Sequence, residues 1–357
     1  MKDGISREEL LKLKISKTLE IPVDKKKIAE EELIEEVDNV IKNIVREEYP
    51  IGEGKTALVF AVEQEKEGII FPSTFCYKII KSNFGLSKQR AKGEMEILDS
   101  AFELNRDMRS ILSKIESEKQ AQYRRECFEK KQKQDLQKTF LLNKNSAIDF
   151  AFSPMPLAVV DGIQKELFND IKKADDKKFF NDGVDFLFMK RIKGLSVKDF
   201  LQKISYLSSL ISQGKYDEFN QKIKEGDLKL DFLKWFFDEN NEGFEIFKKV
   251  LRIMVEKMHE KNIYHRDLHN GNVMIDFKTG LPTIIDFGEG DIGVFETEED
   301  NPYRYEIEKM NENGKMQKVT VFCKTTDEQN IENVLTELED CVINNKQIFA
   351  NILNNSK

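Results

Sequence analysis

The sequence predicts an α+β fold with enough chain for two lobes. Short apolar runs rich in β-branched and aromatic residues, the pattern of strands, lie at Leu58–Val62, Phe75–Ile80 and Val184–Met189. A helical stripe of apolar residues at three- and four-residue spacing runs from Phe244 to Met258. With 357 residues, each of two lobes would have a core of its own.

Composition and charge limit the classes of function. The chain carries a net charge of -8 at pH 7, which argues against a nucleic-acid-binding surface as its main function. No apolar run reaches the roughly 18 residues of a membrane-spanning helix, and the N-terminus lacks a secretory signal pattern. The cysteines are scattered and form no C-x-x-C pair, which indicates a reducing compartment. We therefore expect a cytoplasmic protein, in the producing cell or in a host cell reached by specialised secretion.

Residues 1–48 are predicted to form a helical N-terminal extension. Leu33, Val37, Val40 and Ile44 keep helical spacing in a charged background, so one face of the helix can be buried. The extension is too short to be a stable domain and is expected to dock on the main body. A regulatory role is the alternative.

The glycine-rich stretch after the extension has two interpretations. The G-K-T at 54–56 resembles part of a P-loop, but Tyr49 stands where that motif requires glycine, and a strand-like run follows where a helix is needed. In the second interpretation, Gly52 and Gly54 form a G-x-G loop followed by Val59 on a strand. Glycine lets the backbone approach phosphate groups without an intervening Cβ. The strand pair that follows favours this second interpretation.

Lys78 lies inside the apolar strand Phe75–Ile80, where an unpaired charge would be costly. A partner is expected on the next helix, which carries Glu94 and Glu96. Residues two apart project about 200° from each other on a helix, so only one glutamate can face the lysine. We expect Glu94 to pair with Lys78 and Glu96 to be exposed. The alternative is an edge-strand lysine that reaches solvent.

The first lobe, 49–190, is predicted to contain a charged helical insertion at about 101–150. Such charge runs are usually solvated helix faces, although the insertion also offers a basic surface to a regulatory partner. The basic cluster consists of Arg124, Arg125, Lys130, Lys131 and Lys133. A second charged loop is expected at 164–182.

The second lobe, 191–357, is predicted to be mostly helical. A helix is expected near Val197–Leu210, and the stripe from Phe244 to Met258 predicts a buried helix. Asn262 suits the left-handed position after that helix. A further amphipathic helix is expected around Ile331–Val342.

The functional prediction rests on the stretch 263–291. It reads H-R-D at 265–267, then Asn272, then D-F-G at 286–288. Two short apolar runs on either side of a turn-rich linker at 278–282 predict a hairpin that would bring Asn272 and the D-F-G aspartate close together. Two carboxylates and an amide oxygen are the groups that metal-assisted phosphoryl transfer from ATP requires.

These motifs resemble those of the protein-kinase-like superfamily, over about 49–291. The resemblance implies a two-lobed fold, with an antiparallel-sheet N-lobe that carries one helix and a reduced, mostly helical C-lobe with the catalytic loop 263–291. It also implies phosphotransfer from ATP with Mg²⁺ as the metal.

The resemblance implies a role for each motif residue. Asp267 would be the catalytic base that orients the acceptor hydroxyl, and Asn272 and Asp286 would bind Mg²⁺ and, through it, the nucleotide. Lys78, paired with Glu94, would contact the α- and β-phosphates. His265 (in the same loop) would have a structural role.

The other positions carried over are nucleotide contacts. Gly52, Gly54 and Val59 would cover the nucleotide. Met189 would guard the back of the adenine pocket, and 190–192 would be the hinge whose backbone meets adenine.

Two features depart from the protein-kinase pattern. His269 stands two residues after Asp267, where Ser/Thr protein kinases have a lysine, and the run D-L-H-N-G-N is similar to that of aminoglycoside- and choline-type small-molecule kinases. No A-P-E motif follows the D-F-G. Arg266 matches protein kinases instead, and two alternatives follow: it would pair with a phosphorylated downstream residue, or the protein would be constitutively active. The candidates for that residue are Thr297, Tyr303 and Tyr305.

The sequence therefore predicts an atypical, minimal bacterial-type Ser/Thr protein kinase that transfers the γ-phosphate of Mg-ATP to a protein hydroxyl. A small-molecule kinase and a nucleotide-binding, pseudokinase-like interaction module are the alternatives. The expected partners are a protein substrate or a small-molecule acceptor, with no nucleic acid and no membrane span. A regulatory partner would bind at the charged insertion or at the N-terminal extension.

Overall fold

The computed structural model of the protein divides into two compact units. Unit 1 contains residues 1–99 and 154–191, and unit 2 contains 100–153 and 192–357. The residues that the structure describes are 19–20, 52–53, 57–66, 69–80, 87–131, 138–163, 184–226, 228–238, 242–292, 305–310, 316–321 and 323–355. Several expectations lie outside the described residues, namely the helix of the N-terminal extension, Gly54, the loop 164–182, Thr297 and Tyr303.

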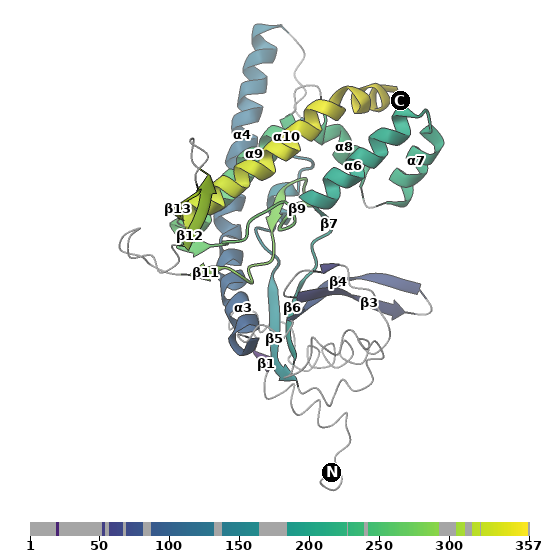
Figure 1. Cartoon of the computed structure of the whole chain (residues 1–357). Coiled ribbons are helices and arrows are strands. Elements are labelled where there is room, and N and C mark those ends of the chain that lie inside the picture. Colours follow the sequence, from purple (N-terminus) through teal and green to yellow (C-terminus); the bar gives the residue numbers. More distant parts are fainter. Residues whose placement is uncertain are drawn as a thin grey trace, which may run out of the picture. The chain divides into compact units, whose positions relative to one another are not determined.

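Unit 1 is built on a six-stranded antiparallel sheet, drawn in purple and teal in Figure 1. The order of its strands is β1-β5-β6-β4-β3-β2, and every neighbouring pair is antiparallel. The expected strands of this region are confirmed. The elements are β1 (Leu19–Glu20), β2 (Gly52–Glu53), β3 (Ala57–Lys66), β4 (Ile69–Ile80), α3 (Ser87–Glu103), β5 (Pro156–Ile163) and β6 (Val184–Lys190).

Unit 2 is mainly helical, and its described residues form three small antiparallel sheets. Its helices are α4 (Asn105–Glu129), α5 (Ser146–Asp149), α6 (Val197–Ser212), α7 (Tyr216–Glu225), α8 (Leu230–Phe236), α9 (Glu242–Glu260) and α10 (Cys323–Asn355). Its strands are β7 (Gly194–Ser196), β8 (Ile263–Tyr264), β9 (Val273–Asp276), β10 (Pro282–Ile284), β11 (Asp291–Ile292), β12 (Tyr305–Met310) and β13 (Met316–Val321). The α+β class is thus confirmed.

The core of unit 2 is centred on α9, whose predicted apolar stripe is buried. Phe244, Phe247, Leu251, Met254 and Met258 are at most 1% exposed. The helix ends as expected, because the residue two positions after it, the asparagine at 262, has a φ of 56°.

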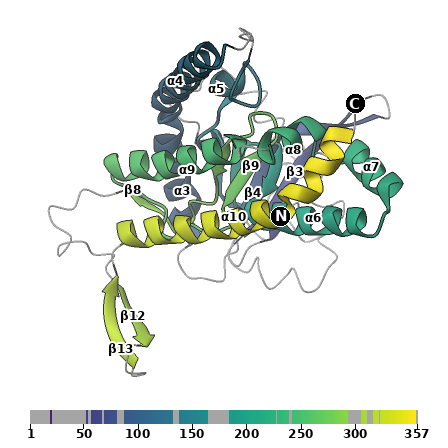
Figure 2. The ribbon, with the colours of Figure 1, turned by 90° about the horizontal axis from the view of Figure 1, so that it is seen from above.

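Helices α9 and α10 pack against each other in antiparallel directions (Figure 2). Two ion pairs join the helices, one from the buried Lys248 to Glu339 at 2.9 Å and one from the exposed Arg252 to Glu332 at 2.7 Å. The exposed pair of Arg252 and Glu332 contributes little to stability. The stability of the pair comes mainly from buried apolar residues, including Ile331 on α10. Figure 2 also shows β12 and β13 as a hairpin of its own.

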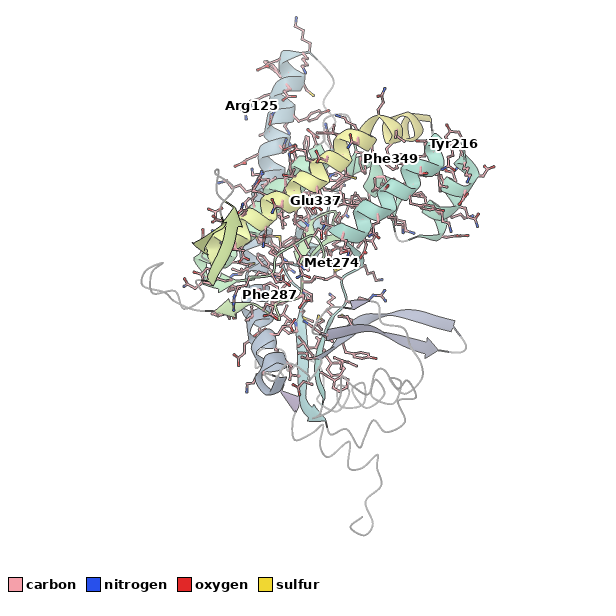
Figure 3. All side chains as sticks on the ribbon, in the orientation of Figure 1. Arg125, Tyr216, Met274, Phe287, Glu337 and Phe349 are labelled. Atoms are coloured by element: carbon pink, nitrogen blue, oxygen red, sulfur yellow. The ribbon has the colours of Figure 1, made fainter. Side chains whose placement is uncertain are left out.

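Helix α4 belongs to unit 2, which differs from the expected insertion into the first lobe. Its Met108 and Leu112, one turn apart, are fully buried. The Asn105 side chain accepts a hydrogen bond of 2.7 Å from the Phe152 N–H, and the Glu116 carboxylate accepts from the backbone at 140–141. The first half of α4 is therefore core structure. Its charged second half, including Arg125, is exposed, as predicted for this region (Figure 3).

Gly194 is the point where β7 comes closest to β9. A Cβ at this position would overlap the carbonyl oxygen of Ile275 and lie 2.8 Å from its carbonyl carbon. Both atoms belong to the backbone of the paired strand, so they cannot move without disturbing the pairing of Leu195 with Ile275. Glycine is the residue that permits this approach.

We expect Gly194→Ala to lower the free energy of unfolding of unit 2 by about 2 kcal/mol, the usual cost of an overlap in packed structure. Urea denaturation followed by the fluorescence of Trp235, the only tryptophan, would measure the loss. Gly214→Ala is the control, because no atom lies within 4 Å of a Cβ there and only its φ of 72° opposes the change. Equal losses in the two variants would contradict the steric explanation.

Among the described residues, no helix combines the length and the apolar character that crossing a bilayer requires.

Candidate functional site

In unit 1, Lys78 and Glu94 form a buried ion pair between the last part of β4 and helix α3. The Lys78 ammonium donates to both carboxylate oxygens of Glu94, at 2.7 and 2.8 Å. Their side chains are 4% and 1% exposed, whereas Glu96 is exposed. The predicted pairing, and the choice of Glu94 over Glu96, are confirmed. A charge-assisted pair at this depth fixes the lysine head group in one position.

The other nucleotide contacts expected in unit 1 lie on strands around Lys78. Gly52 on β2 is opposite Val59 on β3, and Val59 is opposite Lys78 on β4. These three residues therefore stand in one row across three adjacent strands. Met189, on β6, is opposite Cys76 of β4, and its side chain is buried.

In unit 2, His265 joins the H-R-D segment at 265–267 to the segment that contains Asp286. Its Nε2 donates to the carbonyl oxygen of Ile285 at 2.8 Å, and its ring centroid is 4.7 Å from that of Phe287. The ring is fully buried, and this burial lowers the pKa of His265, which the nearby carboxylates of Asp327, Asp286 and Asp267 partly oppose. The neutral ring thus acts as a structural link, the role expected for it.

Asn272 holds the loop together from the other side. Its Nδ2 donates to the backbone oxygen of Asp267 at 2.8 Å and lies 3.4 Å from Oδ2 of the same residue. Its own backbone carbonyl accepts from the Ile285 N–H at 2.9 Å. Both polar groups of the Ile285 backbone are therefore bonded to the loop, which brings Asp267, Asn272 and the residue before Asp286 into one hydrogen-bonded unit.

Arg266 and Asp286 have left-handed backbone conformations, with φ values of 67° and 61°. Non-glycine residues rarely adopt this region, and such conformations cluster where the surrounding structure enforces them, often at functional sites. The sequence pattern did not predict these two conformations. They occur at two of the predicted site residues.

Asp327, on α10, is the acceptor for two backbone N–H groups of the H-R-D segment. Its two carboxylate oxygens accept from the N–H groups of His265 and Arg266, both at 2.9 Å. The side chain is fully buried, and His259 Nε2 lies 3.4 Å from one of its oxygens. A buried carboxylate that accepts two backbone N–H groups fixes the conformation of both residues.

Glu337, one of the residues labelled in Figure 3, provides a second contact from α10 to the loop. Its carboxylate accepts a hydrogen bond of 2.7 Å from Nδ2 of Asn270. The Asn270 carbonyl in turn accepts from the N–H of Lys198, at the start of α6. The loop is thus held by α10 at two points and by α6 at one.

Sequence reasoning missed Asp327 and Glu337. One signal was present, because Asp327 stands four residues before Ile331 and so lies on the face of the helix predicted to be buried. A carboxylate on a buried stripe requires donors nearby. The sequence could not say that these donors lie about sixty positions earlier in the chain.

The donor set suits Mg²⁺. Among the described residues, no three His, Cys, Asp or Glu side chains gather where they could hold an ion by themselves. Mg²⁺ is commonly bound by one or two protein side chains together with substrate phosphates and water, rather than by an all-protein cage. Both hydrogen bonds of the Asn272 side chain use Nδ2, so its Oδ1 is chemically suited to be a ligand beside the Asp286 carboxylate.

Comparisons of the chain with models of protein families and with curated protein sequences gave no match.

Proposed function

We propose that the protein is an ATP-dependent phosphotransferase with the two-lobed kinase fold, acting on a protein hydroxyl. The observation that carries the proposal is the hydrogen-bonded unit of Asp267, Asn272 and the Ile285–Asp286 segment. It supports a rigid arrangement of one base and two metal ligands, the groups that phosphoryl transfer needs. The buried pair of Lys78 and Glu94 supports a fixed cation for the nucleotide phosphates.

In the proposed reaction, Asp267 accepts a hydrogen bond from the acceptor hydroxyl and takes its proton. The acceptor oxygen forms a bond to the γ-phosphorus while the bond from this phosphorus to the β–γ bridging oxygen breaks, so ADP leaves with the electron pair. Lys78 neutralises charge on the α- and β-phosphates. Catalysis is mostly positioning and electrostatic stabilisation.

The metal would be held by Asn272 Oδ1 and the Asp286 carboxylate. Bound there, Mg²⁺ supplies charge neutralisation for the β- and γ-phosphate oxygens. The left-handed conformation of Asp286 and the Ile285 hydrogen bonds would keep this ligand in place.

A small-molecule kinase is the second candidate, and the observation that favours it is His269 in place of lysine. An aminoglycoside, choline or a sugar would then be the acceptor. The base, lysine and metal ligands would have the same roles.

The test is transfer of label from γ-labelled ATP in the presence of Mg²⁺, with protein, aminoglycoside, choline and sugar acceptors offered separately. We expect label in protein, and a loss of about 10²–10⁴-fold in Asp267→Asn, the usual contribution of a positioned base. Asp286→Ala should abolish transfer and the rise in melting temperature caused by Mg-ATP. Glu256→Gln, an exposed substitution on α9, is the control and should behave as wild type.

Label only in a small molecule would establish the second candidate. A rise in melting temperature without label in any acceptor would indicate a nucleotide-binding module instead of an enzyme. Failure of Mg-ATP to bind at all would refute both.

A further inference from the structure

The ring of His269 makes a hydrogen bond to the backbone of its own loop. Its Nδ1 accepts a hydrogen bond of 2.9 Å from the backbone N–H of Gly271. A backbone N–H can only donate, so Nδ1 must present its lone pair. The proton of the neutral ring is therefore on Nε2.

The Nε2 end of the ring lies near the predicted catalytic base. Nε2 is 3.8 Å from Oδ2 of Asp267, and the Nδ2 of Asn272 is 3.4 Å from the same oxygen. The first distance is longer than a direct hydrogen bond, yet a small rotation of either half-exposed side chain would close it. Two donors therefore converge on Oδ2, which leaves Oδ1 as the oxygen that meets an acceptor hydroxyl.

Gly271 is fitted to the imidazole ring. A Cβ at this position would lie 2.7 Å from Cε1 and 3.0 Å from Nδ1 of His269. Gly271 is not among the described glycines with a positive φ, so its backbone conformation alone would accept alanine. A methyl group at this position would instead collide with the imidazole ring of His269.

We propose that His269 is a positioning residue, which orients Asp267 through its Nε2–H and so selects Oδ1 as the oxygen that takes the acceptor's proton. The proposal rests on the proposed function. His269 makes and breaks no bond itself, and the proton, the new O–P bond and the departing ADP are those of the reaction given above. The ring limits the rotation of the Asp267 carboxylate and so keeps it in the geometry that the reaction requires.

Two substitutions test the Nδ1 acceptor and the Nε2 donor of the ring separately. His269→Asn places an amide oxygen near the Nδ1 position and keeps the acceptor for Gly271, whereas His269→Gln places an amide N–H near the Nε2 position and keeps the donor for Asp267. We expect kcat to fall about tenfold or more in His269→Asn and His269→Ala, the usual effect of losing a hydrogen bond to a charged group. His269→Gln should stay within about threefold of wild type. KM for ATP should be unchanged in all three.

A wild-type kcat in His269→Asn would overturn the proposal, as would equal losses in His269→Gln and His269→Ala. A change confined to KM would also overturn it, because it would assign the ring to substrate binding.

Gly271→Ala provides an independent displacement of the ring. We expect it to lower kcat in the wild-type background and to have little further effect in His269→Ala, because the ring it displaces is already gone. Equal fold-losses in the two backgrounds would show that Gly271 acts independently of His269 and would overturn the proposal.

A spectroscopic test needs no activity. The chain has three histidines, so the ring ¹⁵N signals of His269 can be assigned by their loss in His269→Gln. We expect the Nε2–H tautomer, with Nε2 signals that move in Asp267→Asn. The Nδ1–H tautomer, or signals insensitive to Asp267→Asn, would overturn the proposal whatever the activity. If the expected signals are found in a protein that transfers no phosphate, the proposed function is overturned, and with it the positioning role. The contact between the ring and the Asp267 carboxylate would still stand.

Discussion

Glu94→Ala is expected to destabilise unit 1 by about 3 kcal/mol, since removing one partner of a buried ion pair has a cost of this size. The side chains of Lys78 and Glu94 are nearly inaccessible, and the substitution removes both hydrogen bonds between them. Alanine favours helix at least as strongly as glutamate does, so helix propensity cannot be the cause of the loss. Phosphotransfer should fall at the same time, because the lysine head group would no longer be held in one position.

The thiol of Cys76 offers a local measurement of this loss. Burial raises the pKa of Cys76 to about 12, with the charge of Arg191 partly opposing the rise. The thiol should therefore react with a labelling reagent only when unit 1 opens. In a background with the other cysteines replaced by alanine, Glu94→Ala should increase the rate of labelling by about two orders of magnitude.

Glu96→Ala is the matched control for this experiment, because Glu96 lies two residues away on the same helix and is exposed. It should label and turn over close to wild type. Similar effects of the two substitutions on labelling and on turnover would refute the assignment of Glu94 as the partner of Lys78.

Asp327→Ala is expected to have the largest effect in unit 2. The buried N–H of His265 and the partly buried N–H of Arg266 would lose their acceptor, and each such loss costs about 1–3 kcal/mol. We expect a loss of about 3 kcal/mol in the free energy of unfolding, and a kcat close to that of Asp267→Asn. Urea denaturation followed by Trp235 fluorescence and the labelled-ATP assay would measure the two effects.

Two further variants make the result decisive. Asp327→Asn keeps the shape of the side chain but turns an N–H donor toward a backbone N–H, so an intermediate loss is expected. Gln329→Ala changes an exposed residue of the same helix and should behave as wild type. A fully active Asp327→Ala protein would show that the loop holds its conformation without α10.

Local patterns in the sequence predicted much of the fold. The stripe from Phe244 to Met258 predicted the buried helix, and Asn262 marked the left-handed position after it. The apolar runs around Asn272 and Asp286 predicted the hairpin of β9 and β10. Each of these features is determined by residues close together in the chain, where spacing alone indicates which side chains are buried.

Long-range contacts could not be predicted in the same way. The charged composition of 101–150 indicated a solvated insertion, although Met108 and Leu112 of α4 are part of the core of unit 2. The exception was the pair of Lys78 and Glu94, because a buried lysine needs a partner and the geometry of a helix left one choice. No comparable rule linked Asp327 to a loop sixty residues away.

The contacts between α10 and the loop can form only late in synthesis of the chain. Every residue of the H-R-D, Asn272 and D-F-G motifs is synthesised before Asp327 and Glu337. Until that later helix has been added and has packed, His265, Arg266 and Asn270 lack the acceptors that fix them. A nascent or shortened chain would therefore contain the complete motif set without these contacts from α10, and we expect it to gain its proposed activity only after α10 has docked.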